Sequence, residues 1–210
     1  MSTVPVRKYT PEEYLALERA AENKSEYFRG EIFAMAGARE PHNAILVNLI
    51  AAFHAALAGT PCRVYPSDMR VKCPSGLYTY PDMSIVCGMP TLEDDHGDNL
   101  LNPQVIFEIL SPSTEGYDRG KKFEHYQSIE SFREYVLIAQ DRPSAERFVR
   151  STDGGEWVLS TTHDLHGDFN LATCRANVRM ADIYRDISFP PPTIADIHPF
   201  TVYPDGMPPR

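Results

Sequence analysis

The chain has 210 residues, of which 42% are apolar, and this is enough for one domain with a substantial core. No apolar run approaches the roughly 18 residues of a membrane span, and residues 1–10 lack the apolar centre of a signal peptide, so we expect a cytoplasmic protein without membrane contact. The net charge of −9 argues against a generic basic nucleic-acid coat protein but leaves room for one local nucleic-acid groove.

The first predicted elements are a helix and a hairpin. Thr10 as N-cap, Pro11 at the first helical position and Glu13 at the third form a capping box, which predicts a helix start. Residues 25–36 then place two short strand-like runs on either side of Arg29-Gly30, a pattern typical of a tight hairpin. A polar residue, Glu26, lies near the beginning of that hairpin.

The following segments alternate between helices and strands. Apolar residues at helical spacing predict a long core-facing helix over Pro41–Leu57, and a second helix follows over residues 113–128. Strands are predicted at residues 63–65, 69–72, 80–87, 105–110 and 134–138, with an edge hairpin at 146–150 and 157–161. We therefore expect an α/β fold, a mixed β-sheet flanked by helices, in a single domain over residues 1–189. Seven prolines among residues 190–210 predict a Pro-rich C-terminal extension outside the core.

The four cysteines show no metal-binding pattern. They stand at positions 62, 73, 87 and 174, without a Cys-x-x-Cys pair or zinc-ribbon spacing. We therefore expect neither a disulfide framework nor a structural zinc site, and predict that all four are reduced.

The most informative residue is Glu108, within the apolar run Val105–Leu110. Such a run predicts a central strand buried on both faces, where an unpaired ionised carboxylate would cost several kcal/mol. Glu108 must therefore be protonated, bound to a metal, or ion-paired, and Lys122 and Arg119 are the candidates for a structural pair.

Asp82 is the natural companion of Glu108, because it opens the apolar run 83–87 directly after Pro81. Two carboxylates on neighbouring strands present oxygen ligands to a hard divalent ion such as Mg²⁺, which keeps waters and recruits phosphate oxygens. This chemistry indicates phosphoryl transfer or phosphodiester cleavage. The alternative is that Asp82 is a turn residue at the strand entrance.

Lys122, on the helix after Glu108, is the candidate for a cation that offsets charge on the phosphate. Tyr126 lies four positions later on the same face, Arg119 is close in sequence, and Glu26 and His42 could complete the site.

Each of these residues also has an interpretation without a function. Lys122 could be a solvated helix lysine, Tyr126 a core residue, and His42 a helix N-terminal residue. Glu26 could pair with Lys24 or Arg29 on an exposed hairpin.

A resemblance rests on an ordered set of these motifs. They are Glu26-Tyr27-Phe28-Arg29-Gly30-Glu31, Met35, His42, Pro81-Asp82, Phe107-Glu108-Ile109-Leu110-Ser111-Pro112-Ser113-Thr114, Asp118 through Lys122 to Tyr126, and Glu134-Tyr135-Val136-Leu137. Over roughly residues 8–160 the chain resembles the PD-(D/E)XK nuclease superfamily, and within it the Uma-type restriction endonuclease family of bacteria. The resemblance implies a restriction-endonuclease-like fold.

The resemblance also implies roles for the candidate residues. Asp82 and Glu108 would bind Mg²⁺, with Mn²⁺ as a substitute, Glu26 would be an additional acid, and Lys122 the motif lysine. One departure is that the superfamily places its lysine two residues after the second acid, where this chain has Leu110.

The activity implied is that of a metal-dependent endonuclease that acts on DNA as a homodimer, with His42, Arg119 and Tyr126 contacting substrate. The alternatives are a catalytically inactive nuclease-fold module that binds nucleic acid or protein, and an enzyme that uses the same metal site on RNA or small phosphoesters.

Overall fold

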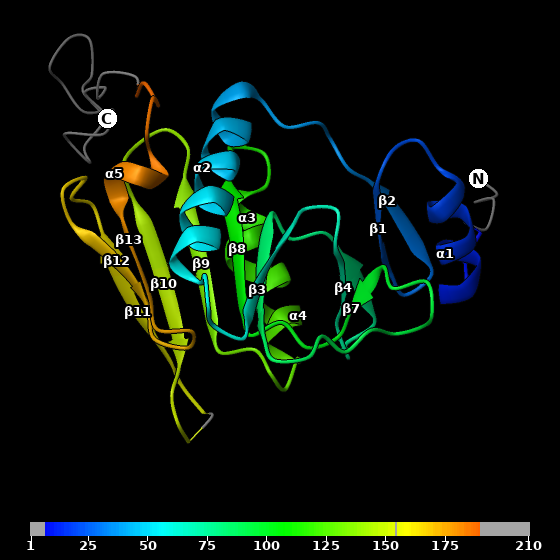
Figure 1. Cartoon of the computed structure of the whole chain (residues 1–210). Coiled ribbons are helices and arrows are strands. Elements are labelled where there is room, and N and C mark those ends of the chain that lie inside the picture. The colour runs from blue at the N-terminus through cyan, green and yellow to red at the C-terminus, as the bar shows by residue number, and fades with distance from the viewer. Residues whose placement is uncertain (1–6, 154, 190–210) are drawn as a thin grey trace, which may run out of the picture.

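The computed structural model describes residues 7–153 and 155–189, which form three β-sheets with helices packed against them (Figure 1). The six-stranded sheet has the order β11 (Trp157–Thr162), β10 (Ala145–Arg150), β9 (Glu134–Ala139), β8 (Val105–Leu110), β6 (Met83–Cys87), β3 (Cys62–Pro66). The five-stranded sheet has the order β2 (Glu31–Ala34), β1 (Ser25–Phe28), β5 (Leu77–Thr79), β4 (Arg70–Lys72), β7 (Asn99–Leu100), and β12 (Asp168–Leu171) pairs with β13 (Ala176–Arg179). The helices are α1 (Pro11–Ala20), α2 (Glu40–Ala56), α3 (Glu115–Tyr117), the π-helical turn η1 (Asp118–Lys122), α4 (Phe123–Gln127) and α5 (Met180–Ile183).

Strand β8 lies in the interior of the six-stranded sheet, parallel to β9 and antiparallel to β6. All six of its residues are buried, as the apolar run predicts. Val105, Phe107 and Ile109 pack in the cluster that α2 contributes to, whereas Ile106 and Leu110 pack with α4 on the opposite face. The predicted fold class, a mixed sheet flanked by helices, is confirmed.

The N-terminal segment forms the predicted helix and hairpin. The capping box of α1 is present in both directions between Thr10 and Glu13. The turn between β1 and β2 places Arg29 and Gly30 at φ 47° and 91°, the left-handed backbone that a two-residue hairpin needs. Strand β1 then pairs with β5, so the hairpin extends a sheet that continues into the middle of the chain.

The segment predicted as one helix over 113–128 is more irregular. The π-helical turn η1 separates α3 from α4, and the buried Tyr135 hydroxyl on β9 donates to the Asp118 carbonyl at 2.9 Å. Phe123 and Tyr126 are nevertheless buried, as the helical spacing predicts. π-helical turns are frequent at functional sites, and this one carries Lys122.

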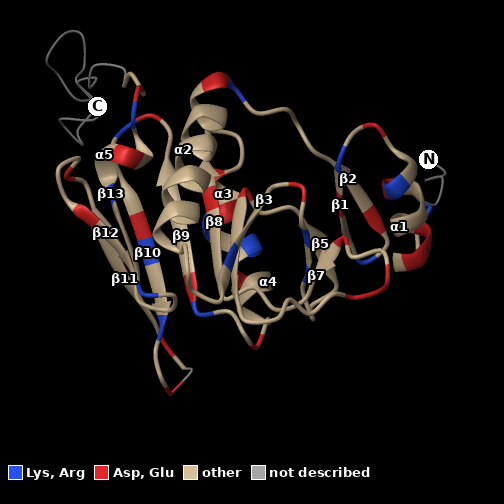
Figure 2. Cartoon of the chain, in the orientation of Figure 1, with Lys and Arg blue, Asp and Glu red and all other residues tan. Residues whose placement is uncertain are grey.

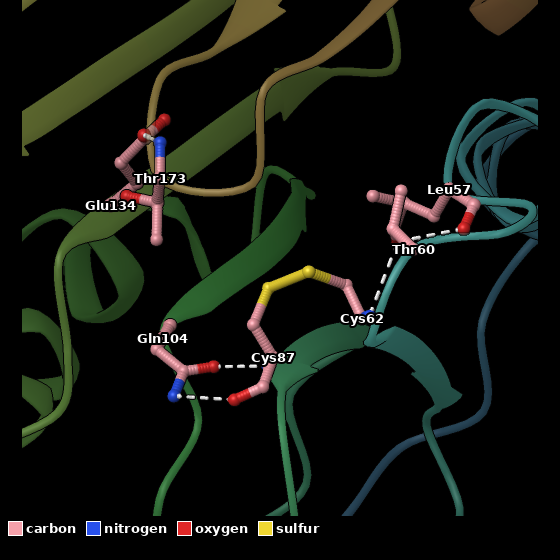
Figure 3. The surroundings of a disulfide bond; sticks show 7 residues. All are labelled: Leu57, Thr60, Cys62, Cys87, Gln104, Glu134 and Thr173. Atoms are coloured by element: carbon pink, nitrogen blue, oxygen red, sulfur yellow. Dashed lines mark hydrogen bonds between the residues drawn. A yellow bond between two sulfur atoms is a disulfide. The ribbon is translucent and has the colours of Figure 1, made fainter.

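The prediction that all cysteines are reduced is wrong for one pair. Cys62 on β3 and Cys87 on β6 lie directly opposite each other and form a disulfide (Figure 3). The Gln104 side chain bonds both the amide and the carbonyl of Cys87, which holds the same end of β6 (Figure 3). Strand register brings these cysteines together across 25 residues of sequence, so no local spacing could reveal the pair. Cys73 and Cys174 are free and buried.

The sequence patterns identified no element after residue 161, but β12, β13 and α5 pack onto α2 there. The Asn48 amide on α2 donates to the carbonyls of Ile183 and Arg185 at 3.2 and 2.8 Å.

Across residues 7–153 and 155–189, every helix is too short or too polar to cross a membrane. Disulfides are rare in the cytosol, and a cytoplasmic location stays a prediction. The predicted extension over 190–210 lies outside the described residues.

Candidate active site

Strand register places Asp82 beside Glu108. Strands β6 and β8 are antiparallel with Met83 opposite Phe107, so Asp82 lies one step further along, next to Glu108 and on the same face of the sheet. The Asp82 carboxylate accepts a hydrogen bond from the Ile109 amide at 2.7 Å. This bond between the two strands fixes one oxygen of Asp82 at the edge of the site.

Glu108 is 3% exposed and has two partners for one oxygen. Its Oε1 accepts from the Tyr126 hydroxyl at 2.7 Å and from the Lys122 ammonium at 2.9 Å. Burial raises the pKa of Glu108 well above its usual range, against the opposing charge of Lys122, and the charges of Asp118 and Asp82 add to the rise. Tyr126 is a core residue, as the alternative interpretation has it, and its hydroxyl holds Glu108.

The Lys122 side chain is 7% exposed and lies among three carboxylates. Its Nζ is 2.9 Å from Glu108, 3.6 Å from Asp118 and 3.7 Å from Glu26. Burial alone would lower the pKa of Lys122, but the three carboxylates outweigh it and raise that pKa. Lys122 is therefore a buried cation and not a solvated helix lysine, whereas its neighbour Lys121 is 73% exposed.

Glu26 reaches the site from β1 in the five-stranded sheet. Its carboxylate accepts a hydrogen bond from the Thr79 hydroxyl on β5 and faces Lys122. Lys24, an alternative partner for Glu26, pairs instead with Asp68 at 2.5 Å. The N-terminal hairpin thus contributes a carboxylate to a site formed mainly by the six-stranded sheet.

Asp118 begins the sequence motif that runs through Lys122, but no role in the site was predicted for it. It is 3% exposed and precedes Lys122 by four residues. Burial raises the pKa of Asp118, while Lys122 opposes that rise. Asp118 and Lys122 lie four residues apart on a predicted helix, and an acid and a base at this spacing can form an ion pair. This spacing could have identified the role of Asp118.

His42 and Arg119 lie in different surroundings. His42, at the start of α2, places Nε2 3.0 Å from Asp82 Oδ1. Burial would lower the pKa of His42, but the hydrogen bond and charge of Asp82 outweigh it and raise that pKa. Arg119 makes two bonds to Glu146, at 2.6 and 2.8 Å, and one to Glu115 at 2.7 Å, so its guanidinium is bound by acids outside the cluster.

We name as the acidic cluster the carboxylates Glu26, Asp82, Glu108 and Asp118, together with Lys122. Four carboxylates face one lysine and one histidine, and acidic and basic segments are interspersed around β8 and α3 (Figure 2). This excess of carboxylate oxygens is the donor chemistry of a hard cation. Among the described residues, no three His, Cys, Asp or Glu side chains are already grouped as metal ligands. Mg²⁺ is usually bound through one or two carboxylates and retains waters, so the two carboxylates of Asp82 and Glu108 match the ligand number and type that Mg²⁺ usually takes from a protein.

Fold and site together define a restriction-endonuclease-like α/β protein. A structure described as a putative nuclease belonging to DUF820, from Anabaena variabilis, superposes with a TM-score of 0.67 at 17% identity, covering 86% of this chain and 98% of that one. At that identity the likeness shows the shared fold.

The chain belongs to the Uma2 family, described as "Putative restriction endonuclease", whose sequence profile matches residues 11–176. Two relatives from Synechocystis sp. (strain ATCC 27184 / PCC 6803 / Kazusa) are similar over most of their length. "Uncharacterized protein slr1290" is 31% identical over 89% of this chain and 97% of its own. "Uncharacterized protein sll1609" is 34% identical over 72% of this chain and 85% of its own. The predicted family is confirmed.

Proposed function

We propose that this protein is a Mg²⁺-dependent endonuclease that hydrolyses phosphodiester bonds in DNA, with Mn²⁺ as a substitute ion. The observation that carries the proposal is Glu108, a carboxylate buried in an interior strand beside Asp82, within a cluster where carboxylates outnumber cations. Burying carboxylates in this way is expensive and destabilises the fold, which is typical of a functional site.

The chain's own residues have distinct roles in this proposal. A divalent ion bound by Asp82 and Glu108 would supply a water of lowered pKa and neutralise charge on the phosphate. Asp82 is held for that role by the Ile109 amide and His42. Lys122 presents a fixed positive charge beside the carboxylates, where it offsets charge that develops on the phosphate in the transition state.

Substrate contact and assembly follow from the same proposal. In this proposal His42, which lies beside Asp82, would contact a phosphate, and Arg119 would do so after exchanging its bonds to Glu115 and Glu146. The chain carries a net charge of −9, so local cations must bind DNA against overall repulsion. Contacts between these cations and phosphates release counterions from DNA, so cleavage is expected to weaken as salt rises. Two copies acting as a homodimer would cut both strands.

The test is cleavage of supercoiled plasmid by the purified protein with Mg²⁺, with Mn²⁺, or with a chelator. We expect nicked and linear products with either ion and none with the chelator. Asp82→Asn removes a ligand charge at nearly constant shape and is expected to reduce the rate by about 100-fold or more. The matched control is Asp153→Asn in the exposed β10–β11 turn, which should retain wild-type activity. A wild-type protein that cuts nothing, or an Asp82→Asn variant that cuts equally well, contradicts the proposal.

A second candidate function is an inactive nuclease-fold module that binds nucleic acid or protein. The observation in its favour is that Lys122 and Tyr126 already bond Glu108, as in a purely structural ion pair. Titration calorimetry with Mn²⁺ separates the two candidates. The endonuclease takes up an ion that Asp82→Asn abolishes, and the inactive module takes up none at this site.

A further inference from the structure

Lys122 has more carboxylate partners than one ammonium needs. Its closest partner is Glu108, at 2.9 Å, and the same Glu108 oxygen accepts from Tyr126. Glu108 is also a ligand in the proposed metal site. A divalent ion and the Lys122 ammonium therefore compete for one carboxylate, because both are cations that draw on the same negative charge.

A second counter-ion is present for the lysine. Asp118 lies 3.6 Å from the Lys122 ammonium and is buried to the same degree as Glu108. The Tyr135 hydroxyl donates a hydrogen bond of 2.9 Å to the Asp118 carbonyl, and the Asp118 amide donates one of 2.9 Å to the Thr114 carbonyl. Asp118 is therefore fixed by contacts that do not involve Glu108.

Asp118 is better suited to this role than Glu26. Both belong with Lys122 to the acidic cluster, but Asp118 lies in the same π-helical turn, four residues before the lysine. Glu26 is 3.7 Å away, belongs to a different sheet, and bonds the Thr79 hydroxyl. Because Asp118 and Lys122 share this turn, the distance between them does not depend on the position of the β1–β2 hairpin that carries Glu26.

We propose that Asp118 is a positioning residue that retains the Lys122 ammonium when Glu108 binds a divalent ion. Without Asp118, Lys122 would remain ion-paired with Glu108, since a buried charge that loses its partner is strongly destabilised. Asp118 thus lets Glu108 bind the ion and keeps the lysine beside the substrate phosphate. This inference rests on the metal site of the proposed function.

The test is a double-mutant cycle read by Mn²⁺ binding in titration calorimetry, which does not depend on cleavage. Asp118→Asn should weaken Mn²⁺ binding about tenfold while Lys122 is present, because the lysine then competes more strongly for Glu108. In a Lys122→Met background the same substitution should weaken binding by about twofold or less. Glu124→Gln, an exposed acid that pairs with Lys121, is the matched control and should leave affinity unchanged.

Two results would overturn the inference. Equal weakening in both backgrounds means that Asp118 acts on the ion directly, and no weakening in either means that the lysine does not compete. Tyr135→Phe removes the hydroxyl that donates to the Asp118 carbonyl and keeps the buried ring, so it provides a second variant, with about a threefold loss that requires Lys122. If the wild-type protein binds no Mn²⁺, both the proposed function and this inference fail. If the wild-type protein binds Mn²⁺ and Asp118→Asn leaves the Mn²⁺ affinity unchanged, this inference alone is refuted.

Discussion

Replacing Lys122 with methionine removes a buried cation and keeps most of the side-chain volume. Glu108 and Asp118, each 3% exposed, then lose their nearest positive charge. Breaking a buried ion pair by removing one partner costs about 3–5 kcal/mol. We expect a loss near the lower end, about 3 kcal/mol, because both carboxyls have raised pKa values and can take up protons in the variant.

Urea denaturation measures this loss in the free energy of unfolding. In thermal unfolding of a protein of this size, 1 kcal/mol corresponds to about 2–4 °C in melting temperature, so Lys122→Met should melt about 6–12 °C below the wild type. Lys121→Met is the matched control, because Lys121 is 73% exposed and pairs with an exposed acid, and its effect should stay within about 0.5 kcal/mol. If the two variants are equally stable, the buried cation does not stabilise the acidic cluster, and our account of the site's electrostatics is wrong.

Two further predictions concern the two ends of β6. The pKa of His42 is raised, so the interaction of protonated His42 with Asp82 stabilises the fold fully below pH 6.5 and is lost as the pH rises through the higher folded-state value. NMR titration should therefore give a midpoint above 6.5 that falls in Asp82→Asn; an unchanged midpoint would show that Asp82 is not the cause. At the other end, the disulfide closes a loop of 25 residues, and a reducing agent should lower the free energy of unfolding by about 3.5 kcal/mol. A Cys62→Ser, Cys87→Ser double variant should not respond to the reducing agent, and a wild type equally indifferent to it would contradict this prediction.

Local sequence patterns predicted the elements whose form depends on nearby residues. The capping box at Thr10, the hairpin at Arg29-Gly30 and the buried strand Val105–Leu110 all lie where the patterns place them. Each depends on backbone geometry or apolar periodicity within a few residues. The helix over 113–128 was predicted less accurately, because contacts with β9 accompany a π-helical turn that periodicity does not encode.

Distant contacts decided the features that the patterns missed. The Cys62–Cys87 disulfide depends on the register of β3 against β6. The partner of Arg119 was likewise not predicted, because Glu146 on β10, 27 residues further along the chain, binds its guanidinium. In both cases the deciding partner is far away in sequence, so spacing alone carries no information about it.

For the acidic cluster, the sequence by itself determined that Glu108 needs a partner, because a carboxylate within an apolar interior strand cannot remain ionised and alone. Only the tertiary structure decided which partners it has. Strand register brings Asp82 beside it, and the turn η1 directs Lys122 and Asp118 toward it. The hairpin then adds Glu26 from another sheet, since ion pairs form between whichever charges the packed elements bring within a few ångströms.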